Sequence, residues 1–475
     1  NKVEFNNRFI DSHTLGLEKY LLKVKNTSWQ QIKKQSGLSQ SDIQKAANLF
    51  IQSDKVISTW AMGITQHKHS VDTVREIANL HLLFGQIGKP GAGLCPVRGH
   101  SNVQGNRTVG INDKPKAVFL DKLDSVFGIT TPKEHGHNVY HALKALHNRR
   151  SKALICLGGN IAAAASDTGF TFEAIRRSQL NVHIATKLNR SHLMLSKDAL
   201  ILPCLGRTEI DRQKSGEQAV TVEDTFSMVH ASHGGTEPEG LNCMSETAII
   251  AGIARATLDG SERIPWDAWR RDAALIRAAI ASVYPEMFHD METRMWEPGG
   301  FHRPLPAARR EWKTDSGKAG FKVPQCLDED DDVSPRLEAR EVIQLMTLRS
   351  NDQFNTTVYG YNDRFRGVSG TRSVVFMNHN DVVRLGFAPG EWVNLRTAIE
   401  PEVLREVGPL QIIAYDIPAG CAAAYYPECN PLVPLWHHAE RSKVPAAKSV
   451  PVTLHKAEPD AKAMKRALPR RDQVV

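Results

Sequence analysis

The chain has 475 residues, of which 41% are hydrophobic and 24% charged, and its 60 Lys and Arg against 52 Asp and Glu give a net charge of +8. These values are typical of a globular protein with several domains, and the sequence has no apolar run of the roughly 18 residues that a membrane span needs. Because the seven cysteines include no Cys-x-x-Cys pair and aromatic residues make up only 7%, we expect no disulfide scaffold, no iron–sulfur cluster held by this chain and no nucleic acid as a partner.

The first part of the chain, residues 1–98, is predicted to be the remainder of an α/β domain that begins upstream. It starts without Met and without a charged-then-apolar leader, so we expect the sequence to be a fragment. We expect, in chain order, helices at 15–24 and 36–53, a strand at 55–63 and a helix at 71–88. Ser39 or Ser41 is the expected N-cap of the second helix. Strand, glycine-bearing loop and helix in this order form a βα unit.

The second part of the chain repeats this pattern. We expect, in chain order, a strand at 152–160, a helix at 171–180, a strand and loop at 181–192, a strand at 198–205 and a long helix at 265–288. The strands are continuous apolar runs with helices between them, which predicts a parallel sheet covered on both faces. Ligands of such sheets bind beyond the carboxyl ends of the strands, where residues 158–160 and 186–187 stand. The acidic run at 327–336 is predicted to be a solvated linker.

From Leu337 on, short apolar segments alternate with Gly, Pro and Asn turns. This spacing predicts a small β-barrel or a β-sandwich. The last residues, 456–475, are rich in Lys and Arg and are predicted to form a basic tail.

The loop "PVRGHSNVQGNRTVG" at 96–110 concentrates hydrogen-bond donors and contains no acid, and no Asp or Glu occurs anywhere between Gln86 and Asn112. Turn chemistry accounts for its Gly and Asn residues. It does not account for Gln104 and Arg107, so we expect an anionic ligand with many acceptors to lie against this loop. By contrast, the histidines of "EHGHNVYH" predict no metal site, because they do not share one helix face or strand frame.

Several phrases in this order resemble the large subunit of the molybdopterin oxidoreductases, the family of formate dehydrogenases, nitrate reductases and dimethylsulfoxide reductase. They are "WAMGITQHKHS", "CPVRGHSNVQGNRTVGI", "LGGNIAAAASD", "ATKLNRSHL", "DALILPCLGRTE", "LRSNDQFNTTVYG", "MNHNDVVRLGFAPGEWVNL" and "YYPECNPLVPLWHHAERSKVPAAKSVPV". Within the family they are most similar to the formate-dehydrogenase-like, YdeP-like branch. The similarity runs over nearly the whole chain.

The resemblance implies a fold of parallel-sheet, Rossmann-like α/β domains with helices on both faces, followed by a C-terminal six-stranded β-barrel domain. The implied domains are the α/β remainder at 1–98, an α/β pterin-dinucleotide-binding domain at 99–326, the acidic linker at 327–336, and a barrel domain with basic tail at 337–475, which also binds the dinucleotide. The implied cofactor is bis(molybdopterin guanine dinucleotide) with molybdenum or tungsten, an anion rich in acceptors.

The matching motifs carry the family's site residues onto this sequence. Arg98 matches the arginine that lies beside metal and substrate in formate dehydrogenases, so the resemblance implies a catalytic role for it. The residues expected to bind the cofactor are Gly63, Gln66, His67, Arg98, Gly99, Asn102, Gln104, Gly105, Gly159, Asn160, Thr186, Lys187, Arg349, Asn355, Thr356, Asn378, Asn430 and Lys448. No residue of this chain is expected to ligate the metal.

In the family, the cysteines of a 4Fe–4S cluster and the protein ligand of the metal lie upstream of the matching region. We therefore expect the chain to be roughly the last three fifths of a cytoplasmic enzyme that oxidises a small anion such as formate and passes electrons through that cluster to an acceptor protein or subunit. A cofactor-free scaffold subunit of an electron-transfer complex is the alternative. A plain nucleotide-binding module is less consistent with several loops at separate strand ends.

Overall fold

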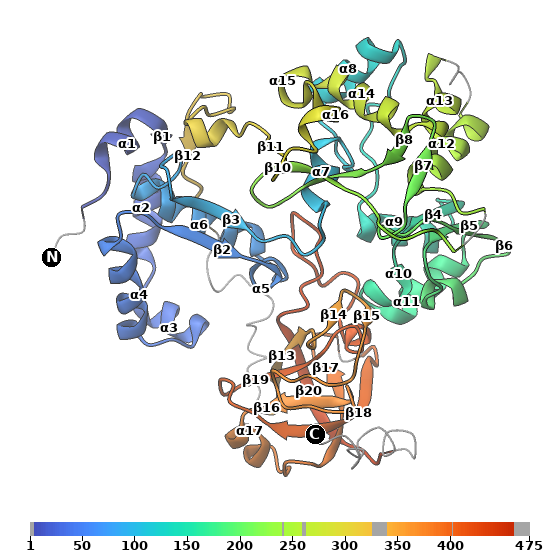
Figure 1. The fold of residues 1–475 in the computed structure, drawn as a ribbon. Helices are drawn as coiled ribbons and strands as arrows, with labels where there is room; N and C mark the ends of the chain where they lie inside the picture. Colours follow the sequence, from blue (N-terminus) through green and yellow to red (C-terminus); the bar gives the residue numbers. More distant parts are fainter. Residues whose placement is uncertain (1–3, 240–241, 259–262, 325–339, 401, 460–475) are drawn as a thin grey trace.

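The computed structural model describes residues 4–239, 242–258, 263–324, 340–400 and 402–459. Figure 1 shows three regions: a first α/β region on the left, a second and larger α/β region on the right, and a β-barrel below. The predicted linker at 327–336 and the tail from 460 on lie outside the described residues. Among the described helices, none is long and apolar enough to cross a membrane.

The first region consists of four helices at its start and a βα unit. Its elements are α1 (Asn7–His13), β1 (Thr14–Leu15), α2 (Leu17–Asn26), α3 (Trp29–Ser36), α4 (Gln40–Gln52), β2 (Ile57–Trp60), α5 (Met62–Thr65), α6 (Ser70–Leu83) and β3 (Gly93–Pro96). Ser39 is the N-cap of α4, and its hydroxyl accepts from the Asp42 amide at 3.1 Å. β2 and β3 pair in parallel.

Helix α3 was not predicted from the sequence. It is short, and Trp29 and Ile32 are its only large apolar residues, so its apolar periodicity extends over less than one turn. Its ends are local: the Ser28 hydroxyl accepts from the Gln31 amide, and Gly37 ends the helix at a φ of 68°. Such caps suffice for a short surface helix.

The second region follows the first in the chain and contains most of the described helices. Its elements are α7 (Val103–Thr108), α8 (Ala117–Phe127), α9 (Val139–His147), β4 (Ala153–Leu157), α10 (Ile161–Ala164), α11 (Thr168–Arg176), β5 (Leu180–Ala185), η1 (Arg190–Leu193), β6 (Asp198–Pro203), β7 (Asp211–Gln213), β8 (Gly216–Gln218), β9 (Val220–Glu223), β10 (Met228–Ser232), α12 (Glu246–Thr257), α13 (Trp266–Arg271), α14 (Ala273–Val283), α15 (Pro285–Phe288), α16 (Met291–Arg294) and β11 (Phe301–His302). The chain then passes through η3 (Pro306–Arg309) to β12 (Ala319–Gly320), which lies in the first region.

Strands β4, β5 and β6 form the predicted parallel sheet, with helices on both faces. On one face Leu154 packs with Leu143 of α9 and Ala174 of α11. On the other face Val182 and Ile184 pack with α12.

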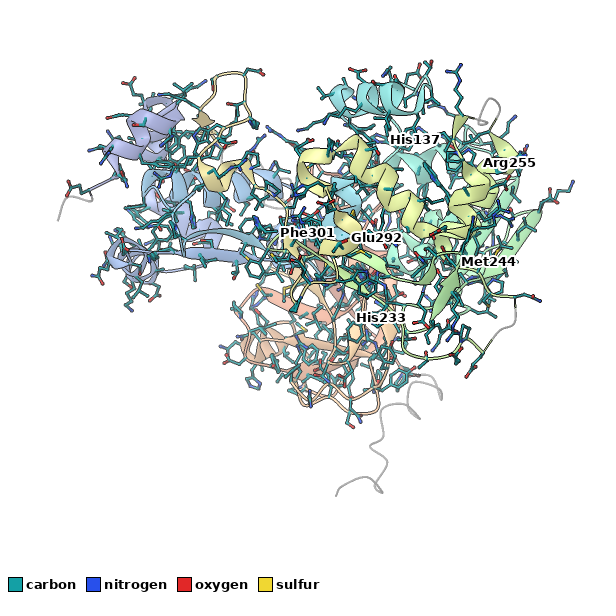
Figure 2. All side chains as sticks on the ribbon, turned by 45° about the horizontal axis from the view of Figure 1, so that its top comes forward. His137, His233, Met244, Arg255, Glu292 and Phe301 are labelled. Atoms are coloured by element: carbon teal, nitrogen blue, oxygen red, sulfur yellow. The ribbon has the colours of Figure 1, made fainter. Side chains whose placement is uncertain are left out.

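The prediction of one helix over 265–288 is wrong. Asp272 is extended, with a φ of −157°, and its carboxylate caps α14 by accepting from the Ala274 amide at 3.1 Å. Pro285 then begins a separate short helix, α15. Glu292 of α16, labelled in Figure 2, forms a two-pronged ion pair with Arg277 and so joins α14 to α16.

A segment assigned to the second domain from the sequence returns to the first region. β12 pairs in parallel with β1, and the rings of Phe321 and Tyr20 stack at 5.4 Å. The Asn79 side chain donates to the carbonyl of Lys322 at 2.7 Å. The end of this segment therefore completes the core of the first region.

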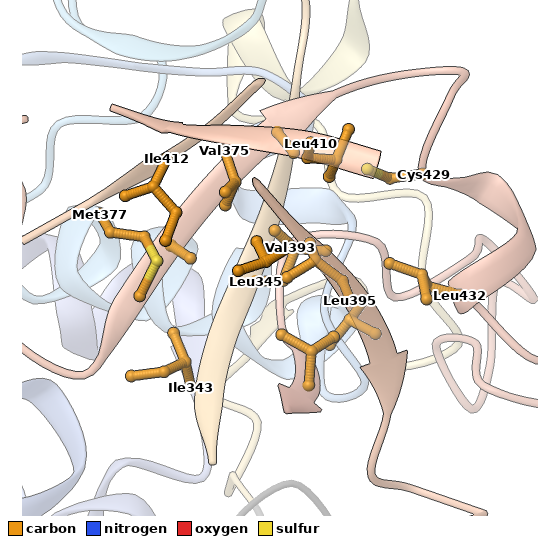
Figure 3. Packing of buried hydrophobic residues seen from close by; sticks show 14 of the residues in the cluster. Ile343, Leu345, Val375, Met377, Val393, Leu395, Leu410, Ile412, Cys429 and Leu432 are labelled. Atoms are coloured by element: carbon orange, nitrogen blue, oxygen red, sulfur yellow. The ribbon is translucent and has the colours of Figure 1, made fainter. Parts of the chain in front are cut away.

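The third region is a closed six-stranded barrel in the order β13-β19-β16-β18-β17-β20, which confirms the predicted barrel. Its elements are β13 (Ile343–Leu348), β14 (Gln353–Phe354), β15 (Thr357–Val358), β16 (Val374–Met377), α17 (His379–Arg384), β17 (Trp392–Thr397), β18 (Glu406–Ala414), β19 (Cys421–Tyr425), η6 (Asn430–Leu432) and β20 (Val450–Lys456). Figure 3 shows alternate residues such as Leu345, Val393 and Leu395 filling its interior.

Candidate functional site

Two predicted loops lie next to each other at one end of the β2–β3 sheet. Trp60 stands beside Pro96 at the carboxyl ends of the two strands. The chain leaves β2 into α5, which contains Gly63, and leaves β3 into the loop that begins at Arg98. The Val97 amide donates to the Trp60 carbonyl at 2.8 Å and extends the pairing to the residue before this loop. The edge is where ligands of parallel sheets bind.

The second parallel sheet brings two further predicted loops together. Leu157 of β4 stands beside Ile184 of β5, and the Gly158 amide donates to the Ile184 carbonyl at 2.8 Å. Residues 159–160 and 186–187 follow directly at this edge. The side chains of Thr186 and Lys187 are exposed there.

Asn160 connects this sheet edge to the barrel. Its amide nitrogen donates to the Thr356 hydroxyl at 3.1 Å, and its amide oxygen accepts from the Ser191 hydroxyl at 3.2 Å. The Asn189 side chain donates to the Gly159 carbonyl at 3.2 Å. Ser191 and Asn189 were not singled out from the sequence, although both lie in the phrase "ATKLNRSHL".

Asn355 and Arg349 meet at the barrel end that faces this edge. Asn355 has a φ of 50°, and its amide oxygen accepts from the Tyr426 hydroxyl at 2.8 Å and from Arg349 at 3.4 Å. The Arg349 guanidinium lies 5.4 Å from the centre of the Tyr426 ring. Burial raises the pKa of Tyr426 to about 12, so its hydroxyl keeps its proton and remains a donor. Tyr426 was also missed from the sequence.

Lys448 lies where the barrel meets α5. Its backbone amide donates to the Gln66 carbonyl at 3.1 Å, and its ammonium group donates to the Thr347 carbonyl. Burial, reinforced by the positive charges of Arg349 and Arg366, lowers the pKa of Lys448 to about 8. Neither Lys448 nor Arg349 has a carboxylate partner among the described residues. The structure thus places two poorly compensated cations together, which is an environment suited to an anion.

The α5 loop completes this side of the junction. The His67 ring contacts the Gly63 carbonyl through Nε2 at 2.9 Å, and the Met62 sulfur accepts from Arg349 at 3.9 Å and from the Gln66 side chain at 3.7 Å. The loop is therefore held by contacts within it and by Arg349 of the barrel, while Gly63 stays exposed.

The loop that carries Arg98 is held by β9 and the turn after it. The Arg98 Nε donates to the Gln104 amide oxygen at 3.4 Å. The Gln104 amide nitrogen donates to Glu223 Oε1 at 2.9 Å and to the Ser227 hydroxyl at 2.7 Å. Arg98 and the following Gly99 are exposed.

Asn102 and Gly105 fit against the same strand. The Glu223 amide donates to the Asn102 side-chain oxygen at 3.0 Å. A Cβ on Gly105 would lie 2.0 Å from that oxygen, so only glycine permits this approach. Glu223 in turn accepts from Arg303 at 2.7 Å. Glu223, Ser227 and Arg303 were missed because nothing in their local sequence marks them.

Two predicted barrel residues have other positions. Asn430 is buried and ties the barrel to α10, since its side chain donates to the Ala163 carbonyl at 2.7 Å. Asn378 follows β16, which runs antiparallel to β19. It therefore lies at the barrel end opposite to Arg349, where it caps α17 and donates to the Ile417 carbonyl at 2.7 Å. The structure does not bring Asn378 to the group formed by the other residues.

No group of three or more His, Cys, Asp or Glu side chains that could hold a metal ion occurs within the described ranges. Cations, amides and glycine loops make up the site. This donor set can bind and orient an anionic, acceptor-rich molecule across two sheet edges and the barrel.

A family model and several known proteins are similar to this chain. Residues 6–209 match the family model "Molybdopterin oxidoreductase". The chain is 44% identical over 449 residues to Protein YdeP of Escherichia coli strain K12, covering 94% of this chain and 58% of that protein. It is 39% identical over 101 residues to formate dehydrogenase H of the same strain, covering 21% of this chain and 14% of that enzyme. The chain thus spans a little more than half the length of YdeP.

Among solved structures, acetylene hydratase from Pelobacter acetylenicus has a similar fold, with a TM-score of 0.67 and 15% sequence identity over 95% of this chain and 68% of that one. At this identity the likeness concerns the fold alone.

Proposed function

The chain belongs to the molybdopterin oxidoreductase family, whose domain it carries at residues 6–209, and we propose that it is the part of a molybdenum or tungsten enzyme that grips bis(molybdopterin guanine dinucleotide). The complete enzyme, in this proposal, is formate-dehydrogenase-like and oxidises a small anion. When bound, the cofactor supplies the two-electron redox chemistry.

The observation that carries the proposal is the pairing of Lys448 and Arg349 without an acid at the barrel end that faces two sheet edges. A partly buried ammonium with a pKa lowered to about 8 is costly unless an anion offsets it. The pyrophosphates of a dinucleotide are such anions, and arginine forks and loop amides match their oxygens. Asn355, Thr356 and Asn160 add amide and hydroxyl groups beside them.

Arg98 is proposed to orient the substrate anion. It is exposed at the sheet edge, it has no acidic partner among the described residues, and its guanidinium rests on Gln104. A carboxylate such as formate fits this guanidinium in a charge-assisted pair, which also stabilises negative charge that shifts during oxidation.

The remaining parts of the proposal concern segments other than this chain. A 4Fe–4S cluster and the protein ligand of the metal are expected upstream, and an acceptor protein or subunit takes the electrons. The cytoplasm is the proposed compartment. The similarity to formate dehydrogenase H, 39% identity over 101 residues of this chain, supports the formate-like reaction.

Elemental analysis of the complete protein from its native source tests the proposal. We expect about one molybdenum or tungsten per chain, with iron, and oxidation of formate or a similar anion with an artificial acceptor. Protein without either metal, from cells that make other molybdoenzymes, would favour the cofactor-free scaffold instead.

Arg98→Ala provides the matching test at one residue. We expect kcat/KM for formate to fall about 10- to 100-fold, as for the loss of a hydrogen bond to a charged group, with metal content unchanged. Arg255→Ala is the control, since Arg255 is exposed at the edge of the second region that lies away from the first region (Figure 2). If the two variants had equal activity, Arg98 would not orient the substrate.

A further inference from the structure

Glu223 is a buried acid that its arginine partner contacts at one oxygen only, unlike Glu292 and Glu428. It is 3% exposed, and Oε1 accepts from both Gln104 and Arg303, whereas Oε2 is buried and has no hydrogen-bond partner among the described residues. A buried carboxylate oxygen without a partner costs free energy.

An ion pair that only stabilises the fold is the simplest explanation, and the geometry speaks against it. Arg277 and Arg372 each grip both oxygens of their partner glutamates, with distances between 2.5 and 3.0 Å. Arg303 instead reaches a single oxygen of Glu223 through Nε. A buried pair of this kind adds little stability by itself. The arrangement makes Oε1 the acceptor for Gln104.

The consequence for Gln104 is a fixed amide orientation. Its nitrogen donates to Glu223 and to Ser227, so its oxygen must face Arg98. If the amide turned by 180°, its NH₂ group would face the Arg98 guanidinium, and two donors would oppose each other. An acceptor at the position of Glu223 excludes this flipped orientation, because it would then face the amide oxygen of Gln104.

We propose that Glu223 is a positioning residue that sets the orientation of Arg98 through the Gln104 amide. Arg303 directly follows β11, the strand that contains the Phe301 labelled in Figure 2. Its guanidinium donates to Glu223 and fixes this carboxylate in turn. The inference rests on the proposed function for its effect on catalysis, but the clamp on the Arg98 loop is a property of the chain itself.

The first test measures the loop directly. In the purified complete protein without substrate, hydrogen–deuterium exchange of peptides within 98–108 is expected to quicken about tenfold in Glu223→Ala, the effect of losing about one net hydrogen bond. Glu237→Ala is the matched control, because Glu237 pairs with Arg212 on the surface. Exchange of 98–108 that is unchanged in Glu223→Ala would overturn the proposal.

The second test separates positioning from folding. In the metal-loaded enzyme, we expect Glu223→Ala to raise KM for the substrate anion about tenfold, with metal content equal to that of the wild type. Glu223→Gln should restore most of the affinity, since its amide oxygen also accepts from Gln104 and Arg303. Equal KM in all three proteins at full metal content would contradict the positioning role.

If Glu223→Ala does not fold, Gln104→Ala removes the same bond from the loop side, and the same two readouts apply. A complete protein without molybdenum or tungsten would defeat the proposed function, while the exchange measurement would still decide whether Glu223 holds the loop.

Discussion

Lys448 keeps an ammonium group inside the junction between the barrel and α5. Its partner there is the carbonyl of Thr347, and the nearby charges of Arg349 and Arg366 are of the same sign. A protein that had to optimise only its stability would replace such a residue by an apolar one. The proposed cofactor anion would offset this charge.

Lys448 gives a prediction about pH. The free energy of unfolding of the wild type, relative to that of Lys448→Met, is expected to rise between about pH 8 and about pH 10.4. In this window the folded chain has released the proton of Lys448, whose pKa is about 8, and the unfolded chain still binds it near the ordinary pKa of about 10.4. The state with fewer bound protons gains as pH rises.

Urea unfolding at pH 7.5 and pH 10 measures this difference. Lys456→Met is the control, because the side chain of Lys456 is 80% exposed. The prediction would be wrong if the difference in unfolding free energy between the wild type and Lys448→Met stayed constant from pH 7.5 to pH 10. The ammonium group of Lys448 would then be well solvated in the folded protein.

At the scale of elements, the barrel is held by its interior rather than by its loops. Leu395 of β17 and Leu345 of β13 are fully buried in one cluster that also includes residues of β16 and β18 (Figure 3). Strand alternation directs these side chains inward, and closure leaves the barrel strands without free edges. The barrel can therefore hold Arg349 and Lys448 rigidly at its end.

We expect Leu395→Ala to lower the free energy of unfolding by about 2–5 kcal/mol, from lost burial and the cavity left behind. Leu404→Ala should change it by less than about 0.5 kcal/mol, because Leu404 is 71% exposed. Denaturant unfolding, followed by intrinsic fluorescence or by hydrogen exchange of barrel peptides, compares the free energies of unfolding of the two variants. A similar cost for both would mean that the barrel interior repacks freely.

For the whole molecule, the β4–β5–β6 sheet has apolar side chains that its helices do not cover. Ile155 of β4 and Leu200 of β6 flank Val182 on the same face and are 50% and 51% exposed, while α12 covers Val182. Both strands are edges of the sheet as the structure describes it. Exposed apolar edge strands favour association.

The chain studied alone is accordingly expected to self-associate as its concentration rises. The double variant Ile155→Lys and Leu200→Lys should remain monomeric to concentrations at least about tenfold higher, because charges on edge strands oppose pairing. Sedimentation velocity measures this, with Leu404→Lys as a control at an exposed position outside the sheet. If the double variant and the control self-associated at the same concentration, the association would have to involve another surface.

Apolar periodicity and Gly or Pro turns are local properties, and they predicted the βα unit of the first region and the parallel β4–β5–β6 sheet. The turn spacing of the last part left a barrel or a sandwich open, and the family resemblance implied the barrel. The sequence by itself also indicated the donor-rich, acid-free loop at 96–110. The domain limits and the cofactor roles of single residues stay predictions. Local pattern failed at α3, a short helix with two large apolar residues, and at 265–288, where Asp272 ends one helix and caps the next.

Only the tertiary structure decided which side chains meet. Gln104 and Glu223 are 119 positions apart, and Asn160 and Thr356 are 196 apart. Asn378 and Asn430 both lie at barrel strand ends, yet antiparallel pairing of β16 with β19 sends Asn378 to the opposite end. Such contacts depend on how elements pack, and no short stretch of sequence contains that information.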